Sequence, residues 1–304
     1  MSAPVIEYTR YQSRPFVADG SDPGPLQGPE ATPPLKTYAV IDASKVFALP
    51  EKLTGGTDPH CCLYKDAAAL GEAAPWLVEL TLKGQLAANL ITHSDPPMRW
   101  ELLQYEAAIF FQSAADLASL RAHLRRYTSV PDEGGAQFLL RFYDPVFLSA
   151  LIEAMTPEEK AGFLAPIARL SAIVTTYDGA WIYHQFEPTE ALAETASAPL
   201  VFDREKRHQL RNIGFRRRAW AISKGAGHDA KTARDFERHC VRMMACDYHD
   251  DTRLLELFAL YRQLPGAAQP DFLKTARSGA FSPRALGLHF CKQHGLTYPE
   301  GASQ

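Results

Sequence analysis

The sequence is poor in the features that would place it in a membrane or outside the cell. It has five cysteines in 304 residues, an odd number, and only Cys61 and Cys62 are adjacent. This usage indicates reduced thiols rather than a disulfide framework. No segment approaches the 18 uncharged apolar residues typical of a membrane-spanning helix, and the first 20 residues lack the apolar region of a secretory signal. We therefore expect a soluble cytoplasmic protein with no membrane partner.

An excess of one charge is also missing. The formal net charge is −3, which gives no general attraction to nucleic acid or to an anionic membrane. A local cationic cluster lies near residue 210, with Phe215 and Trp220 beside it. Its members are Arg204, Lys206, Arg207, Arg211, Arg216, Arg217 and Arg218. On a helix these positions wrap around much of the circumference, so a solvated face and a surface for an acidic protein partner both stay open. A nucleic-acid patch is disfavoured because Asp203 and Glu205 interrupt the cluster, and we expect no nucleic-acid partner.

Sequence motifs of catalysis are missing too. The chain has no Gly-x-Ser-x-Gly elbow, no Walker loop and no GxGxxG after a strand, and the pair Gly55–Gly56 is too short to hold a phosphate. The best metal candidates are His239, Cys240, Cys246 and His249. On one helix they would extend over about 15 Å, too far for one tetrahedral ion. We expect no catalytic residue, no metal and no cofactor.

Composition and periodicity divide the chain into three parts. Residues 1–36 hold seven of the 22 prolines and little periodic hydrophobicity, which predicts a flexible proline-rich leader. Short apolar runs of strand length alternate with helical pieces over residues 37–187, which predicts an α/β (α+β) lobe with a mixed sheet. The segments over residues 200–297 all have helical patterns, which predicts an all-helical C-terminal lobe.

The stretch LLRFYDPVFL at residues 139–148 combines a strand pattern with a helix start. RRYTSV and QFLLRFY, joined by PDEGG, predict an antiparallel hairpin whose second strand places Arg141 and Tyr143 on one face. Asp144 is a good N-cap and Pro145 suits the first helical position. Downstream, TPEE predicts a second helix with a capping box between Thr156 and Glu159.

Arg141, Tyr143 and Asp144 lie close together at the end of a predicted strand. Such a group is consistent with an active site or with a structural role. A carboxylate that caps a helix accepts backbone N–H bonds, which favours its charged form and makes it a poor proton shuttle at neutral pH. If its strand position buries Arg141, it needs a carboxylate nearby, and Asp144 and Asp42 are the candidates. The residues alone therefore favour a structural role.

Several of these runs, in this order and spacing, are similar to one bacterial family. They are YAVIDA (38–43), PHCCLYK (59–65), APWLVEL (74–80), HLRRYTSV (123–130) and FLLRFYDPVFL (138–148). They resemble the type VI secretion effector adaptor, or chaperone, family of the Tap/Tec type (domain of unknown function 4123). The resemblance covers roughly residues 37–165, and HLRR and RFYDP are its most specific pieces. The signature residues are Asp42, His123, Arg141, Tyr143, Asp144 and Pro145.

The resemblance implies a non-enzymatic adaptor that binds one toxin effector in the bacterial cytoplasm and helps to load it onto the VgrG spike. It supplies no catalytic residues. We add the hypothesis that the arginine-rich helix lines a groove between the lobes and pairs with effector carboxylates through Arg207, Arg211, Arg216, Arg217, Arg218 and Trp220. The alternative is a hydrolase or nucleic-acid-acting enzyme that uses the cleft between the lobes.

Overall fold

The computed structural model describes residues 7–27, 34–65 and 70–300. The chain divides into two compact units, Met1–Leu210 and Arg211–Gln304. The division falls inside helix α8 (Arg204–Gly225), so the first turns of that helix belong to the N-terminal unit. The fold class predicted from the sequence is confirmed, with a large sheet in the N-terminal half and helices over most of residues 204–294.

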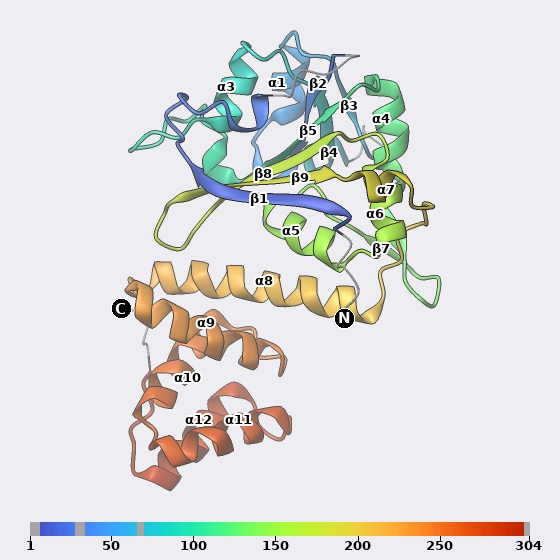
Figure 1. Ribbon diagram of the computed structural model, residues 1–304. Coiled ribbons are helices and arrows are strands. Elements are labelled where there is room, and N and C mark those ends of the chain that lie inside the picture. Colours follow the sequence, from blue (N-terminus) through green and yellow to red (C-terminus); the bar gives the residue numbers. More distant parts are fainter. Residues whose placement is uncertain (1–6, 28–33, 66–69, 301–304) are drawn as a thin grey trace, which may run out of the picture. The chain divides into compact units, whose positions relative to one another are not determined.

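A seven-stranded sheet forms the centre of the N-terminal unit (Figure 1). Its strands follow the order β1-β9-β8-β5-β2-β4-β3, and each of these neighbouring pairs is antiparallel. The prediction of a mixed sheet is therefore wrong: the connections reverse the chain direction between neighbouring strands. The strands are β1 (Thr9–Phe16), β2 (Lys36–Asp42), β3 (His60–Cys62), β4 (Pro75–Glu79), β5 (Ala108–Ser113), β8 (Arg169–Thr175) and β9 (Trp181–Pro188).

Strand β1 corrects the prediction of a flexible leader. All eight of its residues pair with β9, from Thr9 opposite Pro188 to Phe16 opposite Trp181. Six of the eight side chains are exposed, as expected at the edge of a sheet, and Phe16 at the end is buried. The polar composition of this segment is thus that of an edge strand whose side chains are exposed on both faces of the sheet. Residues 1–6 and 28–33 of the expected leader lie outside the described residues.

Helices cover both faces of the sheet, with α1 and α3 on one side and α5 and α6 on the other (Figure 1). Strand alternation divides the apolar side chains between the faces. Ala39 and Ile41 of β2 face a core shared with α1 and α3, whereas Tyr38 stacks on Phe111 of β5 on the opposite face. Apart from the first turns of α8, the helices longer than one turn among the described residues of this unit are α1 (Leu49–Thr54), α3 (Gln85–Ile91), α4 (Leu117–Leu124), α5 (Pro145–Ala154) and α6 (Pro157–Leu164).

The predicted hairpin forms a small separate sheet of β6 (Ser129–Pro131) and β7 (Gln137–Leu139). Its second strand ends at Leu139, four residues earlier than the pattern QFLLRFY suggests. The expected alternation stops there, and both Phe142 and Tyr143 are buried. The predicted start of α5 at Asp144 and Pro145 is confirmed, because the Asp144 carboxylate accepts the N–H of Val146. The predicted capping box of α6 is confirmed as well.

The C-terminal unit is built from helices around one apolar core. Its centre contains Phe236, Met243, Leu257, Phe272 and Phe290, all buried. The helical periodicity of the sequence places these side chains on the inner faces of four helices. After the second part of α8, these helices are α9 (Ala230–Met244), α10 (Asp251–Gln263), α11 (Gln269–Arg277) and α12 (Pro283–His294).

Candidate functional site

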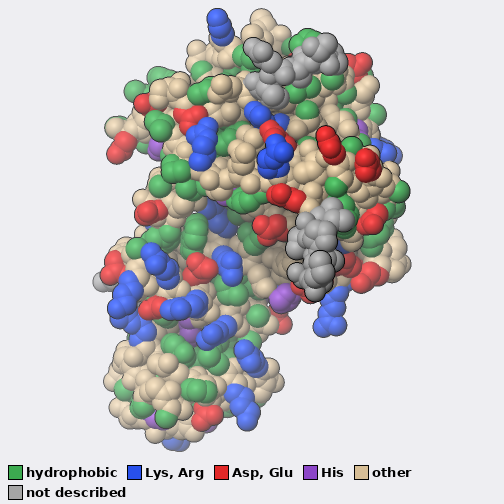
Figure 2. Space-filling view, in the orientation of Figure 1, with side chains coloured by type: hydrophobic (Ala, Val, Ile, Leu, Met, Phe, Trp, Pro, Cys, Tyr) green, Lys and Arg blue, Asp and Glu red, His purple; other side chains and the backbone are tan. Residues whose placement is uncertain are grey.

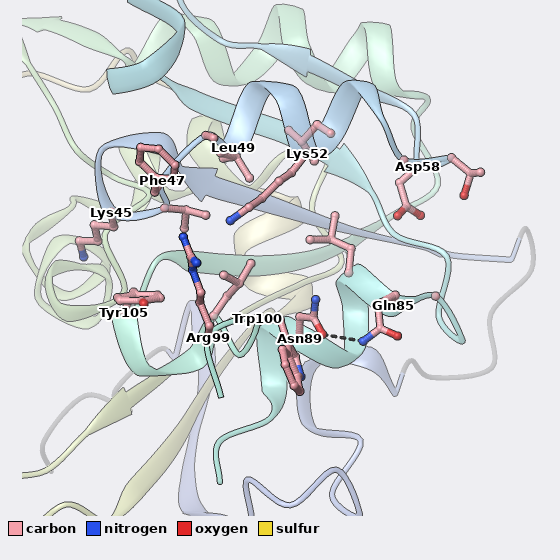
Figure 3. A pocket seen from close by; sticks show the side chains of 18 residues that line it. Lys45, Phe47, Leu49, Lys52, Asp58, Gln85, Asn89, Arg99, Trp100 and Tyr105 are labelled. Atoms are coloured by element: carbon pink, nitrogen blue, oxygen red, sulfur yellow. Dashed lines mark hydrogen bonds between the residues drawn. The ribbon is translucent and has the colours of Figure 1, made fainter. Parts of the chain in front are cut away.

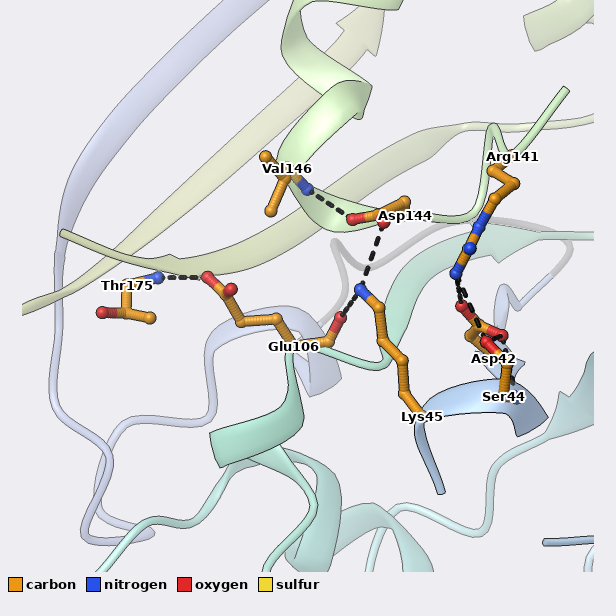
Figure 4. Close-up of polar contacts among 8 residues, drawn as sticks. All are labelled: Asp42, Ser44, Lys45, Glu106, Arg141, Asp144, Val146 and Thr175. Carbon is orange, nitrogen blue, oxygen red and sulfur yellow. Dashed lines mark hydrogen bonds and ion pairs between the residues drawn. The ribbon is translucent and has the colours of Figure 1, made fainter. Parts of the chain in front are cut away.

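Arg141 fixes the segment after the hairpin to the end of β2. Its guanidinium forms an ion pair with Asp42, whose side chain is 1% exposed, whereas that of Arg141 is 47% exposed. The Asp42 carboxylate also accepts the N–H of Ser44 at 3.0 Å and its hydroxyl at 2.7 Å. Of the two carboxylates that the sequence offers to Arg141, Asp42 is the one in contact (Figure 4). The buried carboxylate is thus fully engaged in hydrogen bonds and an ion pair.

Asp144 has a second partner besides the helix that it caps. The Nζ of Lys45 lies 3.2 Å from its Oδ2 and donates to the carbonyl of Glu106 at 3.0 Å. The Glu106 carboxylate in turn accepts the N–H of Thr175 at 2.6 Å (Figure 4). These contacts join β2, α5 and β8 at one end of the sheet. We call Asp42, Ser44, Lys45, Glu106, Arg141 and Asp144 the anchor cluster.

The other signature residues also make structural contacts. His123 is buried at the end of α4, where its Nε2 lies 2.8 Å from the carbonyl of Phe163 and its Nδ1 lies 2.6 Å from Arg126. Burial lowers the pKa of His123, which keeps the ring neutral, with Nε2–H as the donor. The hydroxyl of Tyr143 meets that of Tyr64 at 3.2 Å, and burial raises its pKa. Both side chains therefore tie elements together.

An open groove of about 710 Å³ lies beside the anchor cluster (Figure 3). Residues from 45–58, 84–89 and 99–105 line it, so its walls come from α1, α3 and the loops before and after them. The aromatic side chains on it are well exposed: 83% for Phe47, 58% for Trp100 and 43% for Tyr105. We call this the aromatic groove. Exposed aromatic side chains gathered in a concave surface are typical of binding sites for another molecule.

Positive charge dominates the polar part of the aromatic groove. The side chains of Lys52 and Arg99 extend from opposite walls toward its middle (Figure 3). Neither has an ion-pair partner among the described residues, whereas Lys45 is paired with Asp144. The one lining carboxylate, Asp58, accepts the N–H of Thr81 at 2.8 Å. The groove thus presents two unneutralised cations beside apolar surface.

Most of the arginines predicted to bind an effector have partners inside their own unit. Arg207 pairs with Asp132 at 3.2 Å. In the C-terminal unit, Arg216 pairs with Glu237 at 3.5 Å and Arg218 with Asp251 at 2.8 Å. The remaining three members make ring contacts or hydrogen bonds, since Arg211 lies over Phe215, Arg217 lies over Trp220, and Trp220 donates to Glu237.

Lys and Arg side chains are numerous on the helices of the C-terminal unit, with Asp and Glu side chains among them (Figure 2). This mixture lowers the net positive charge that a nucleic-acid surface needs. The predicted arginine set is therefore a mixed-charge surface rather than a uniform cationic patch.

Two of the four cysteines and histidines considered for a metal, His239 and Cys240, are core residues, whereas Cys246 and His249 are partly exposed. His239 and Cys240 are buried in the core of the C-terminal unit, and over the described ranges no three His, Cys, Asp or Glu side chains are grouped to hold a metal ion. Burial raises the pKa of Cys61 to about 11, so its thiol is protonated at neutral pH. Within the same ranges, no helix combines the length and apolar character needed to cross a bilayer.

Comparison with known families places both features of the N-terminal unit in one segment. Residues 37–162 match the family model "Domain of unknown function (DUF4123)". The matched segment contains the whole aromatic groove and every member of the anchor cluster, and it ends before the arginines of α8. No curated protein and no solved structure matches the chain.

Sequence reasoning missed the aromatic groove. Phe47 lies 53 positions before Trp100, and Phe47, Trp100 and Tyr105 all lie in loops or short turns, where no periodicity marks a shared surface. One signal was available for two of them: Trp100 and Tyr105 stand beside charged residues, outside the apolar runs that form the core, whereas Phe47 stands between Val46 and Ala48. Such isolated aromatics in loops are candidates for binding surfaces.

Proposed function

We propose that this protein is a non-enzymatic adaptor that binds a type VI secretion effector in the bacterial cytoplasm and helps to place it on the VgrG spike. The observation that carries the proposal is the aromatic groove, an exposed apolar surface inside the segment that matches the family model. Exposed apolar surface of this kind promotes aggregation of a protein that stays alone, and it stabilises the complex of a protein that binds a partner there. The motifs HLRR and RFYDP lie in the same segment and support the adaptor role through their family resemblance.

The anchor cluster supports a binding scaffold rather than a reaction centre. Asp144, the best candidate for an acid or base near the strand end, is held by the N–H of Val146 and by Lys45. A general base needs a free oxygen to accept a proton, whereas Oδ1 of Asp144 accepts the N–H of Val146 and Oδ2 lies against the ammonium of Lys45. In the proposed function, the cluster holds the walls of the groove in place.

The decisive experiment identifies the effector and reconstitutes the complex. The tagged full-length chain is isolated from its native organism, and bound proteins are identified by mass spectrometry. The proposal expects an effector whose gene lies beside a VgrG gene, and a stable stoichiometric complex when the two proteins are produced together. If the purified pair fails to associate, or if the chain turns over a substrate without a protein partner, the adaptor role is excluded.

We further propose that Arg216, Arg217 and Arg218 contact carboxylates of the effector. Reversal of all three to Glu should weaken the reconstituted complex while the fold survives. The ion pairs lost with Glu237 and Asp251 involve exposed arginines and contribute at most about 1 kcal/mol each. Arg234→Glu, another exposed cation of the same unit, is the matched control. Equal affinity of the triple variant, the control variant and the parent protein would remove these arginines from the binding surface.

A further inference from the structure

One wall of the aromatic groove contains a residue in an uncommon backbone conformation. Phe47 is 83% exposed, and the next residue, Ala48, has a φ of 53°, in the left-handed region that residues other than glycine seldom adopt. Such a conformation is strained for a residue with a side chain and persists where its surroundings enforce it. Here Lys45, three residues earlier, is bound to Asp144 and to the carbonyl of Glu106. The loop is thereby fixed with its aromatic side chain facing outward.

The charges in the groove specify the complementary partner. Lys52 comes from α1 and Arg99 from the opposite wall, and the described residues offer neither of them an ion-pair partner. Two cations that approach the middle of one concave surface repel each other unless an anion lies between them. An arginine forms its best contacts with a carboxylate, which it binds through two parallel hydrogen bonds. A carboxylate of the bound partner satisfies both groups.

The apolar part of the groove specifies the form of that partner. Phe47, Trp100 and Tyr105 stand around a cavity of about 710 Å³, within the range of about 300–1,000 Å³ found for preformed binding clefts. A space of this size receives several side chains of one short segment. Amphipathic helices dock into such grooves with apolar side chains at i, i+3, i+4 and i+7.

We infer that the aromatic groove binds an amphipathic helix of the effector, with its apolar face against Phe47, Trp100 and Tyr105 and an acidic side chain between Lys52 and Arg99. This inference rests on the proposed function, since the effector supplies the helix. It adds the place and the chemistry of the contact, which the family resemblance does not give. The partner helix carries Leu, Ile or Phe on one side and Asp or Glu at its edge.

Two designed helical peptides provide the first test. They share the same leucine face and carry either Glu or Lys on their polar face, and their binding to the full-length protein is measured by the fluorescence of Trp100, with Trp100→Phe as the blank. The acidic peptide should bind about tenfold more tightly, which corresponds to about 1.4 kcal/mol. Lys52→Glu combined with Arg99→Glu should reverse the preference, whereas Lys231→Glu, an exposed cation of α9, should leave it unchanged. Equal binding of both peptides, or no binding of either, overturns the inference.

Photo-crosslinking in the reconstituted complex provides the second test. A photoreactive amino acid replaces Phe47 or, as a matched control, Leu139, which is 75% exposed on β7 and lies outside the groove. Crosslinks from position 47 should map to an acidic amphipathic helix of the effector, and position 139 should give none there. Crosslinks to a basic or non-helical segment overturn the inference.

The outcomes separate this inference from the proposed function. If the effector co-purifies as before with Phe47→Glu and with the Lys52/Arg99 double reversal, the adaptor role stands and the groove is not its site. If no effector is found but the acidic peptide binds, the groove stands and the adaptor role fails. A dimer that Phe47→Glu dissociates, measured by analytical ultracentrifugation, would make a second copy of the chain the occupant and would also overturn the inference.

Discussion

Replacement of Asp144 by Ala tests whether the anchor cluster supports the fold at this strand end. The substitution removes the cap of α5, which is worth about 1 kcal/mol. It also removes the contact with Lys45, whose side chain is 24% exposed against 10% for Asp144. A charged hydrogen bond contributes about 1.5–3 kcal/mol when buried, and solvent at Lys45 reduces this to about 1 kcal/mol. The free energy of unfolding should therefore fall by about 2 kcal/mol.

Matched variants separate the two contributions. Asp144→Asn keeps a good capping side chain but loses the charge, so it should cost about 1 kcal/mol. Lys45→Met removes the other partner, and the double variant with Asp144→Ala should cost less than the sum of the two single variants by about 1 kcal/mol. Urea denaturation gives these values. Hydrogen exchange at residues 43–48 shows whether the wall of the aromatic groove loosens with the loss of Lys45's partner, as the contacts imply.

Two results would refute this account of Asp144. The first is a coupling energy near zero between positions 45 and 144, since the ion pair would then contribute nothing. The second is an Asp144→Asn variant that keeps its full stability but loses a measurable enzymatic activity. That outcome would favour the alternative interpretation of the chain as a hydrolase, because a structural cap has no chemistry to lose.

Two further predictions concern buried titratable groups. Lys206→Met should lower the free energy of unfolding, measured by urea denaturation, by about 3 kcal/mol. The side chain of Lys206 is 5% exposed and its ammonium lies 3.1 Å from Glu159, so its loss leaves a buried carboxylate without a cation. An unchanged midpoint of denaturation would contradict this. Burial, with a smaller contribution from Arg242, lowers the pKa of His239 from 6.5 to about 3, so the neutral ring stabilises the fold above pH 6.5 and this stability is lost as the pH falls toward 3. Thermal melts from pH 7 to pH 4 should show a smaller decline for His239→Leu than for the parent protein, and parallel curves would contradict the assignment.

Local signals in the sequence predicted the helix starts well. A cap followed by proline identified Asp144 and Pro145, and the pattern TPEE identified the capping box between Thr156 and Glu159, because these contacts join residues at most three positions apart. The pairing of Arg141 with Asp42 spans 99 positions, and the sequence could only narrow it to two carboxylates. Asp144 is not the partner of Arg141, because its carboxylate is paired with Lys45. No local sequence pattern connects Lys45 with Asp144.

The edge strand and the groove could not be predicted for the same physical reason. Strand β1 has exposed Arg10, Gln12 and Arg14 and is held by backbone pairing with β9, more than 160 residues later, so its side chains carry little signal. The groove is likewise formed by side chains that the fold leaves uncovered rather than by those that it buries. Hydrophobic periodicity reports burial in a core. It does not identify apolar side chains that stay exposed and gather on one surface.

In the proposed function, the anchor cluster links the RFYDP motif to binding through the structure of one loop. Arg141 and Asp144 hold Asp42 and Lys45, the first and last residues of the short segment that leads into Phe47. In that segment Ala48 has a positive φ and Phe47 is exposed, and both features are unfavourable. A loop without these ion pairs would adopt an ordinary backbone conformation and bury the aromatic side chain. If the groove binds as proposed, weakening these ion pairs should lower its affinity before it unfolds the sheet, because they hold the loop that carries Phe47. Residues 141–145 then act as a structural element that fixes the shape of the groove, whose lining residues lie about 40 to 100 positions away in sequence.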